Sequence, residues 1–246
     1  MRTISETVKH LLIINGIFFL ATLTLGQQVY DWFGLHYFGN QKFQPWQPLT
    51  HMFMHGDLMH IFFNMFGLWM FGTPLEQMWG RNKFIFFYLS TGLGAAALQM
   101  ALYYWQVGGV TELIRSLGGS ATDINRFFNI GELPMYIADQ VSQNQLQSGY
   151  ASYNAVLVGA SGALYGVLVG FAMLFPNAQL MLLFPPIPVR AKYLVPLLIL
   201  ADLFFGFTAY SIGPIAHFAH VGGAITGLIM MFYWRKNQFN RNRWDL

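Results

Sequence analysis

The sequence contains no cysteine and has few charged residues. The absence of cysteine excludes disulfide bonds, thiolate metal sites and cysteine nucleophiles. Lys and Arg number 13 and Asp and Glu number 10, together 9% of the 246 residues, whereas a soluble domain has about 25% charged residues. So few charges cannot cover a surface that faces water. The net charge of +3 is too small and too scattered to indicate nucleic-acid binding.

Apolar residues are abundant instead: 55% of the chain is hydrophobic, with 24 Phe, 12 Tyr and 7 Trp. The hydrocarbon core of a bilayer is about 30 Å thick, and a helix needs about 20 apolar residues to cross it. Six apolar runs approach this length, at residues 11–26, 58–72, 84–105, 155–175, 193–212 and 214–234. We therefore predict an all-α membrane protein in which residues 1–246 form a single domain of six transmembrane helices.

The distribution of Lys and Arg predicts how the spans are oriented. With the N-terminus inside, the basic residues of the inner segments are Arg2, Lys9, Arg81, Lys83, Arg190, Lys192, Arg235, Lys236, Arg241 and Arg243, and those of the outer segments are Lys42, Arg115 and Arg126. This bias predicts that both termini are cytoplasmic, and we expect the plasma (inner) membrane. A cleavable signal peptide is an alternative for the first span, but no small-x-small cleavage site follows it and only five spans would remain.

Two outer segments are unusual. Residues 27–50 are rich in aromatic rings, which favour the lipid headgroup layer, so we expect this first outer segment to associate with membrane lipids. Residues 106–154 form an extended polar insertion, in which the helical spacing of Ile124, Phe127 and Phe128 predicts a short surface helix. The insertion is either a solvated loop or a lid over the outer face.

Polar side chains near the outer ends of the spans are the candidates for function, because an ionisable group in a membrane is costly. Five of the seven histidines gather at the starts of the second and sixth spans: His51, His55, His60, His217 and His220. Ser161 lies in the fourth span, which also runs from outside to inside. At 1.5 Å per residue, Ser161 and His220 each lie about 9 Å below the outer ends of their predicted helices.

Glycine stripes beside these residues allow the fourth and sixth spans to approach closely. The stripes consist of Gly162, Gly166 and Gly170 on the fourth span and Gly223 and Gly227 on the sixth. A serine hydroxyl beside a neutral imidazole is a nucleophile with its base. Attack on an amide creates an oxyanion, for which His60 and Asn64, one turn apart on the second span, can supply donors together with the backbone N–H of Ser161.

Three motifs carry a family resemblance, and each lies on a different predicted span. They are His60-x-x-x-Asn64, Gly159-Ala160-Ser161-Gly162 and Ala219-His220-x-x-Gly223-x-x-x-Gly227. In this order the chain resembles the rhomboid intramembrane serine proteases over nearly its whole length. The resemblance implies that Ser161 is the nucleophile, His220 the general base and acid, and His60 with Asn64 the oxyanion hole. It also favours His220 over His217 and matches Tyr165 to an aromatic residue that stacks on the catalytic imidazole.

The same resemblance implies substrates and a route of entry. Rhomboid proteases cut transmembrane proteins in or near the membrane and use no metal or other cofactor. A helical amide is shielded by its own hydrogen bond, so the substrate must unfold locally before cleavage. Lateral entry past the fifth span is expected, with Phe204, Phe205 and Phe207 at the gate. His51 and His55 match positions that support the site in the family.

The chain departs from the family pattern at Trp46-Gln47, where rhomboids commonly have Trp-Arg, so anchoring of an arginine to lipid phosphate is not expected. Asp202 lies near the middle of the fifth span and, counted from the inner end, falls several ångströms deeper than His220. We therefore expect a structural or gating role, or a protonated state, rather than the third member of a triad. Glu76 and Arg81 are expected to form an ion pair at the inner end of the second span.

Two other functions would also account for part of the sequence. A metal or proton transporter would use the membrane histidines, but it leaves Ser161 unexplained, and no internal repeat is evident. An inactive rhomboid relative would bind client proteins without cutting them, although the intact Ser161 and His220 argue against this.

Overall fold

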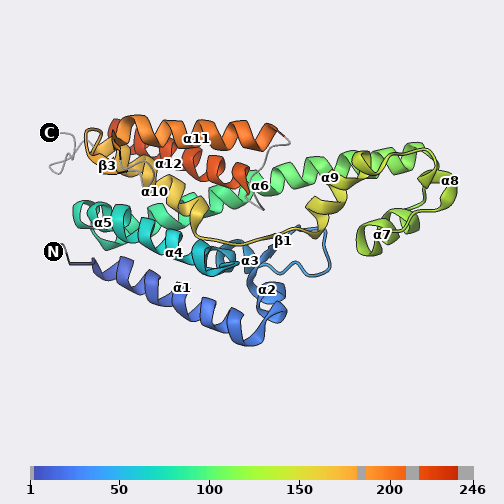
Figure 1. The fold of residues 1–246 in the computed structure, drawn as a ribbon, viewed down its shortest axis with the longest axis horizontal. Helices are drawn as coiled ribbons and strands as arrows, with labels where there is room; N and C mark the ends of the chain where they lie inside the picture. Colours follow the sequence, from blue (N-terminus) through green and yellow to red (C-terminus); the bar gives the residue numbers. More distant parts are fainter. Residues whose placement is uncertain (1–2, 182–186, 209–215, 238–246) are drawn as a thin grey trace.

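The structure is a computed structural model that describes residues 3–181, 187–208 and 216–237, and its long helices run side by side (Figure 1). These helices are α1 (Glu6–Leu25), α4 (Leu58–Gly67) with its continuation through η2 (Leu68–Gly72) and α5 (Thr73–Trp79), α6 (Arg81–Ser116), α10 (Ser161–Leu174), α11 (Ala191–Phe207) and α12 (His217–Asn237). By length and composition, α1, the continuous segment Leu58–Trp79 and α6 can each cross a bilayer, whereas α10 is apolar but shorter.

Each predicted span overlaps one of these helices, but the start of the fourth differs in a way that affects the site. The fourth helix was expected from residue 155, and this is wrong: α10 begins at Ser161, because residues 156 and 157 form the short strand β2 (Val156–Leu157). Strand β2 pairs in antiparallel register with β1 (Leu35–His36) of the first outer segment. The expected end of the fifth span at residue 212 and start of the sixth at residue 214 lie outside the described residues.

Helices α10 and α12 pack against each other at glycine positions, as the stripes predict, and α6 packs against both. A Cβ atom at Gly162 would lie 2.5 Å from the Cβ of Ala95 on α6, and one at Gly227 would lie 2.8 Å from the Cα of Gly166. A Cβ at Gly223 would collide with the carbonyl oxygen of Gly162. Real side chains cannot fit at these distances, so the absence of a side chain sets the spacing of the three helices.

Glu76 stabilises the start of α1 rather than pairing with Arg81. Its carboxylate accepts hydrogen bonds from the backbone N–H groups of Thr7 (2.9 Å) and Val8 (3.0 Å) and from the hydroxyl of Ser5. The first N–H groups of a helix have no partner within the helix, and a carboxylate placed there also complements the helix dipole. The predicted ion pair is wrong because the end of the second helix lies beside the start of α1.

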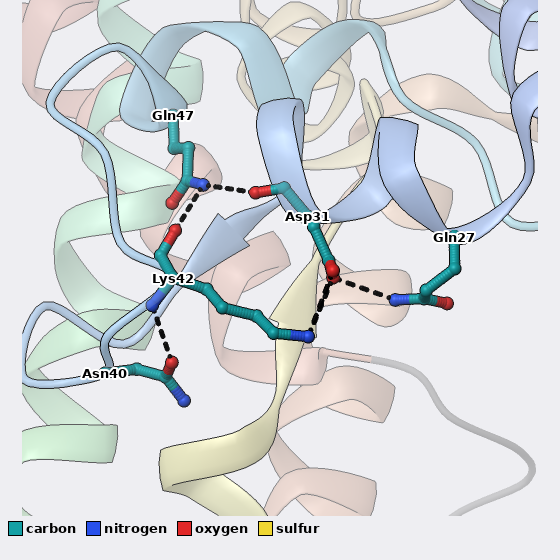
Figure 2. A network of polar contacts seen from close by, with 5 residues as sticks. All are labelled: Gln27, Asp31, Asn40, Lys42 and Gln47. Carbon is teal, nitrogen blue, oxygen red and sulfur yellow. Dashed lines mark hydrogen bonds and ion pairs between the residues drawn. The ribbon is translucent and has the colours of Figure 1, made fainter.

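The first outer segment contains α2 (Gln27–Phe33), β1, α3 (Gln47–Thr50) and the short helix η1 (His51–Phe53). The fully buried amide of Gln47 holds it together (Figure 2). Its nitrogen donates to the carbonyl oxygens of Asp31 (3.0 Å) and Lys42 (2.9 Å), and its oxygen accepts from the N–H of His36 (3.2 Å). Gln47 therefore faces inward, where it replaces backbone partners that the segment lacks.

Asp31 forms the polar edge of the same segment. Its carboxylate accepts hydrogen bonds from the ammonium group of Lys42 and from the amide of Gln27 (Figure 2). Burial alone would raise the pKa of this carboxyl, but the two donors outweigh it, and the pKa is lower than its ordinary value. Asp31 is therefore ionised near neutral pH and pairs with Lys42.

The insertion at residues 106–154 is helical, and its helices pack around a hydrophobic core that also includes Tyr37 of the first outer segment. Helix α6 continues into it as far as Ser116, and α7 (Ala121–Ile130), α8 (Met135–Ala138) and α9 (Gln143–Asn154) follow. The buried residues of this core are Tyr37, Val107, Val110, Ile114, Phe127, Phe128, Ile137 and Tyr153. Figure 1 shows α7 and α8 at the far end of α6, away from the other long helices. The short helix predicted around Phe127 is α7, and the solvated-loop alternative is wrong.

The connection between α10 and α11 contains the two-stranded hairpin of β3 (Gln179–Met181) and β4 (Pro188–Arg190). Pro188 begins β4, in keeping with the expectation that prolines interrupt the helix here. Pro185 and Pro186 lie outside the described residues.

Candidate active site

The side chains of Ser161 and His220 meet where α10 and α12 begin. The Oγ atom of Ser161 lies 2.9 Å from Nε2 of His220, which is hydrogen-bond distance. Ser161 is the first residue of α10, and His220 lies three residues after His217, the first residue of α12. The two groups therefore share one level, but in the first turn of each helix and not 9 Å below it.

Tyr165 covers one face of the His220 ring. The two rings are nearly parallel, with an angle of 8° between their planes and 4.3 Å between their centroids. Tyr165 lies one turn after Ser161 on α10, so the same helix presents the hydroxyl and the ring that packs on its partner. The stacking expected for Tyr165 is present, and it restricts rotation of the imidazole.

Asp202 contacts His220, contrary to the expectation that it lies too deep. One of its oxygens, Oδ1, lies 3.0 Å from Nδ1 of His220 and 2.6 Å from Nδ1 of His217. Asp202 is five residues before the end of α11, and His220 is three residues after the start of α12. At 1.5 Å per residue these depths differ by about 3 Å, which side chains bridge. The predicted fifth span continues to residue 212, whereas α11 ends at Phe207, so Asp202 lies closer to the outer end of its helix than expected.

His60 and Asn64 lie on α4, which begins after the N-cap Asp57 as predicted. A carboxylate oxygen of Asp57 accepts from the backbone N–H of His60 at 2.9 Å. The Nδ1 atom of His60 is 3.3 Å from the N–H of Gly56, so Nδ1 accepts and the ring hydrogen is on Nε2. Asn64 is buried, and its amide nitrogen donates to the carbonyl of His60 at 2.7 Å.

The side chains of Ser161, His220, His60 and Asn64 line one cavity of about 940 Å³. Its walls come from α4, α6, α10, α11, α12 and the segments before α4 and α10, and they include Ser161, His220, His60, Asn64, Gln99 and Phe205. Of residues 106–154, only Gln106 contributes to the lining, so α7, α8 and α9 do not form part of the cavity wall. A second, smaller cavity between α4 and α10 is also lined by Ser161 and Tyr165, together with apolar side chains such as Phe63 and Leu164.

Comparison with known sequences identifies the family. The sequence model of the Rhomboid domain matches residues 42–122 and 127–237, which is most of the chain. This chain belongs to the rhomboid family. It is also similar to the rhomboid protease GlpG of Klebsiella pneumoniae subsp. pneumoniae (strain MGH 78578) and of Klebsiella pneumoniae strain 342. The identity to each is 30% over 109 residues, which cover 44% of this chain and 40% of each relative.

The match to this family and the long apolar helices together show that this rhomboid is an integral membrane protein. The similar segment spans less than half the length of the two relatives.

Two further histidines of this rhomboid, His51 and His55, contact residues of the site. His51 is buried, its Nδ1 lies 3.1 Å from the carbonyl of Gln47, and its own carbonyl accepts the N–H of Gly159 at 3.0 Å. His55 is fully buried, and its ring packs edge-on against His60 with the centroids 4.9 Å apart. His51 thus holds the loop before Ser161, and His55 holds the ring of His60.

The sequence reasoning missed the network around Asp202. Within the described residues, Asp202, His217 and His220 form the single group of at least three His, Asp or Glu side chains that could hold a metal ion, with ligand atoms within 4.8 Å of one another. These atoms are engaged in hydrogen bonds with each other. Two features of the sequence could have predicted this network. His217 and His220 are three residues apart and share a face of α12, and a carboxylate in an apolar helix such as α11 needs polar partners.

Proposed function

We propose that this rhomboid is an intramembrane serine endopeptidase that cuts other membrane proteins in or near their transmembrane segments. The 2.9 Å contact between the Ser161 hydroxyl and Nε2 of His220 carries this proposal, because such a pair is a nucleophile with its base. The large cavity around the pair supplies room for an extended peptide and for water. The names of the two Klebsiella relatives also support a protease.

The first half of the reaction forms an acyl-enzyme. His220 takes the hydroxyl proton of Ser161 through Nε2 while Oγ attacks the carbonyl carbon of the substrate. The carbonyl oxygen becomes an oxyanion, and the ring N–H of His60, the amide of Asn64 and the backbone N–H of Ser161 are the proposed donors to it. When the tetrahedral intermediate collapses, His220 gives the proton to the leaving amine, and the C–N bond breaks.

The second half regenerates the serine. Water from the cavity gives a proton to His220 and attacks the ester, and the proton then returns to Oγ of Ser161 as the new carboxyl end leaves. Tyr165 holds the imidazole in one plane through both halves, which keeps Nε2 directed at Oγ. The protein side chains and water account for every proton in this scheme, so no cofactor is required.

The proposed arrangement in the membrane has six spans formed by α1, the segment Leu58–Trp79, α6, α10, α11 and α12. Residues 1–246 form one domain in this proposal, with the termini in the cytoplasm and the cavity open to the outer face. The positive-inside bias of the sequence supports that orientation. The plasma (inner) membrane is the proposed location, and the aromatic side chains of residues 27–50 contact its outer lipids.

Substrate entry is proposed to be lateral, between α4 and α11. The apolar cavity beside α4 leads to Ser161 and Tyr165, and Phe205 of α11 lines the main cavity. Phe204 and Phe207 on the same helix are exposed, as expected for side chains that face lipid. The substrate is a transmembrane segment whose helix unwinds near the cut, because a peptide bond inside a helix is shielded.

A fluorophosphonate probe that reacts with activated serines tests the proposal. The wild-type protein should be labelled, and Ser161→Ala and His220→Ala should each abolish labelling, whereas a metal chelator should have no effect. A histidine-based transporter would show no labelling, and an inactive client-binding relative would show none either. Labelling that persists in Ser161→Ala would rule out Ser161 as the nucleophile.

A further inference from the structure

Asp202 stands out because it is a carboxylate buried in an apolar helix. Only 6% of its surface is exposed, and α11 otherwise carries apolar side chains around it. A buried carboxylate is costly unless hydrogen bonds compensate for the loss of water. Its compensation comes from α12, where two histidines reach the same oxygen, Oδ1.

The hydrogen-bond directions follow from the chemistry of His220. To act as a base toward Ser161, Nε2 must present a lone pair, so the ring hydrogen must be on Nδ1. The group 3.0 Å from Nδ1 is the carboxylate of Asp202, which can only accept while it is ionised. The contact with Asp202 therefore selects the tautomer of His220 that can remove a proton from Ser161.

His217 fixes the carboxylate in turn. Its Nδ1 lies 2.6 Å from the same Oδ1 atom, and its ring lies 5.9 Å from that of Phe205, centroid to centroid. Two histidines of α12 thus hold one side chain of α11 in place, and that side chain holds the base.

We propose that Asp202 is a positioning residue that keeps the hydrogen of neutral His220 on Nδ1 and stabilises the imidazolium formed when Nε2 takes the proton of Ser161. Asp202 stays ionised throughout, and no proton is transferred to it. His217 acts on the reaction only through Asp202. This inference rests on the proposed function.

The test compares Asp202→Asn, His217→Gln and Ser161→Ala in the full chain, each reconstituted in lipid bilayers. The measurement is saturation kinetics with the fluorophosphonate, which separates the binding constant of the probe from the rate of serine phosphonylation. Asp202→Asn keeps the shape and removes the charge, so the rate should fall about 10- to 100-fold, the usual weight of a charge-assisted hydrogen bond, with binding unchanged. His217→Gln should lower the rate by a smaller factor, because His220 keeps its contact with Asp202.

Other outcomes would overturn the inference. Equal rates in wild type and Asp202→Asn would remove the positioning role, and so would an equal loss in His217→Gln, which would indicate packing between α11 and α12. A rate that changes on metal chelation in wild type but not in Asp202→Asn would show the three side chains to be a metal site. If the wild-type protein is not labelled at all, the proposed function fails instead.

A second measurement requires no variant of Asp202. Nitrogen-15 labelling of histidine reports which ring nitrogen carries the hydrogen, and His220→Ala assigns the signal. The Nδ1–H form of His220 should dominate in the neutral state, with a proton resonance shifted far downfield by the carboxylate. A neutral His220 with its hydrogen on Nε2 would contradict the proposal even if Asp202→Asn failed to fold.

Discussion

Nε2 of His60 occupies the space in which a side chain at residue 159 would lie: a Cβ atom at Gly159 would come within 2.7 Å of it. Gly159 also has a φ of +122°, a backbone conformation that is strained for any residue with a side chain. Gly159, two residues before Ser161, therefore has two roles. It allows the sharp turn from β2 into α10, and it lets the loop pass directly against the proposed oxyanion donor.

Gly159→Ala should therefore disturb the site and the fold together. The strained backbone is expected to lower the free energy of unfolding by about 1–3 kcal/mol, and displacement of His60 should sharply reduce fluorophosphonate labelling. Gly108→Ala is the matched control, since nothing lies within 4 Å of a Cβ at that helical position. It should leave labelling intact and stabilise α6 by about 0.5–1 kcal/mol. Normal labelling of Gly159→Ala would show that the contact with His60 does not matter.

Asn64→Ala tests the oxyanion hole. Loss of one donor typically costs about 2.7 to 4 kcal/mol, or about 100- to 1000-fold in rate, so turnover of a quenched fluorescent transmembrane peptide should fall by that factor while probe binding is kept.

Asn15→Ala is the control for this variant. The Asn15 amide also donates to a carbonyl four residues earlier, at 2.7 Å, and is buried, but it does not line the cavity. Its turnover should match that of wild type once the folded fraction is measured. Wild-type turnover in Asn64→Ala would remove Asn64 from the oxyanion hole.

Gln47→Ala tests the role of the residue that stands where rhomboids commonly have arginine. The change leaves the N–H of His36 and the carbonyls of Asp31 and Lys42 without their partner, which is expected to cost about 1–3 kcal/mol of unfolding free energy. An unfolding curve in denaturant, in which the loss of probe labelling reports the unfolded fraction, measures this cost. Gln27→Ala is the control, because its contact with Asp31 is exposed. A lipid-anchoring role would instead make the stability of Gln47→Ala depend on the lipid headgroup.

Cross-linking of α4 to α11 tests lateral entry. The sequence contains no cysteine, so Phe63→Cys with Phe205→Cys supplies the only thiols for a short bifunctional reagent, and both positions line the cavity. The cross-link should block cleavage of a transmembrane protein far more than labelling by the small probe. Equal inhibition of both would indicate that substrates do not enter between these helices, and the two single-cysteine variants control for modification alone.

Some features of this rhomboid follow from the sequence alone. The scarcity of charge predicts a membrane protein, and the glycine stripes predict that the fourth and sixth spans meet and bring Ser161 and His220 together, whereas the place of Tyr165 was implied by the resemblance to rhomboid proteases. These are local patterns: helical spacing decides which residues share a face, and a glycine decides how close a neighbour can come. The short helix around Phe127 and the N-cap Asp57 were predictable for the same reason.

Only the tertiary structure decided the rest. Helix α10 begins at Ser161 because β2 pairs with β1, more than 100 residues earlier in the chain. Glu76 binds the start of α1 instead of Arg81, and Asp202 contacts two histidines on α12. In each case a buried polar group forms hydrogen bonds with groups that distant segments of the chain place beside it, because an unpaired polar group in a low-dielectric interior is costly. The spacing of neighbouring residues does not predict which distant groups these are.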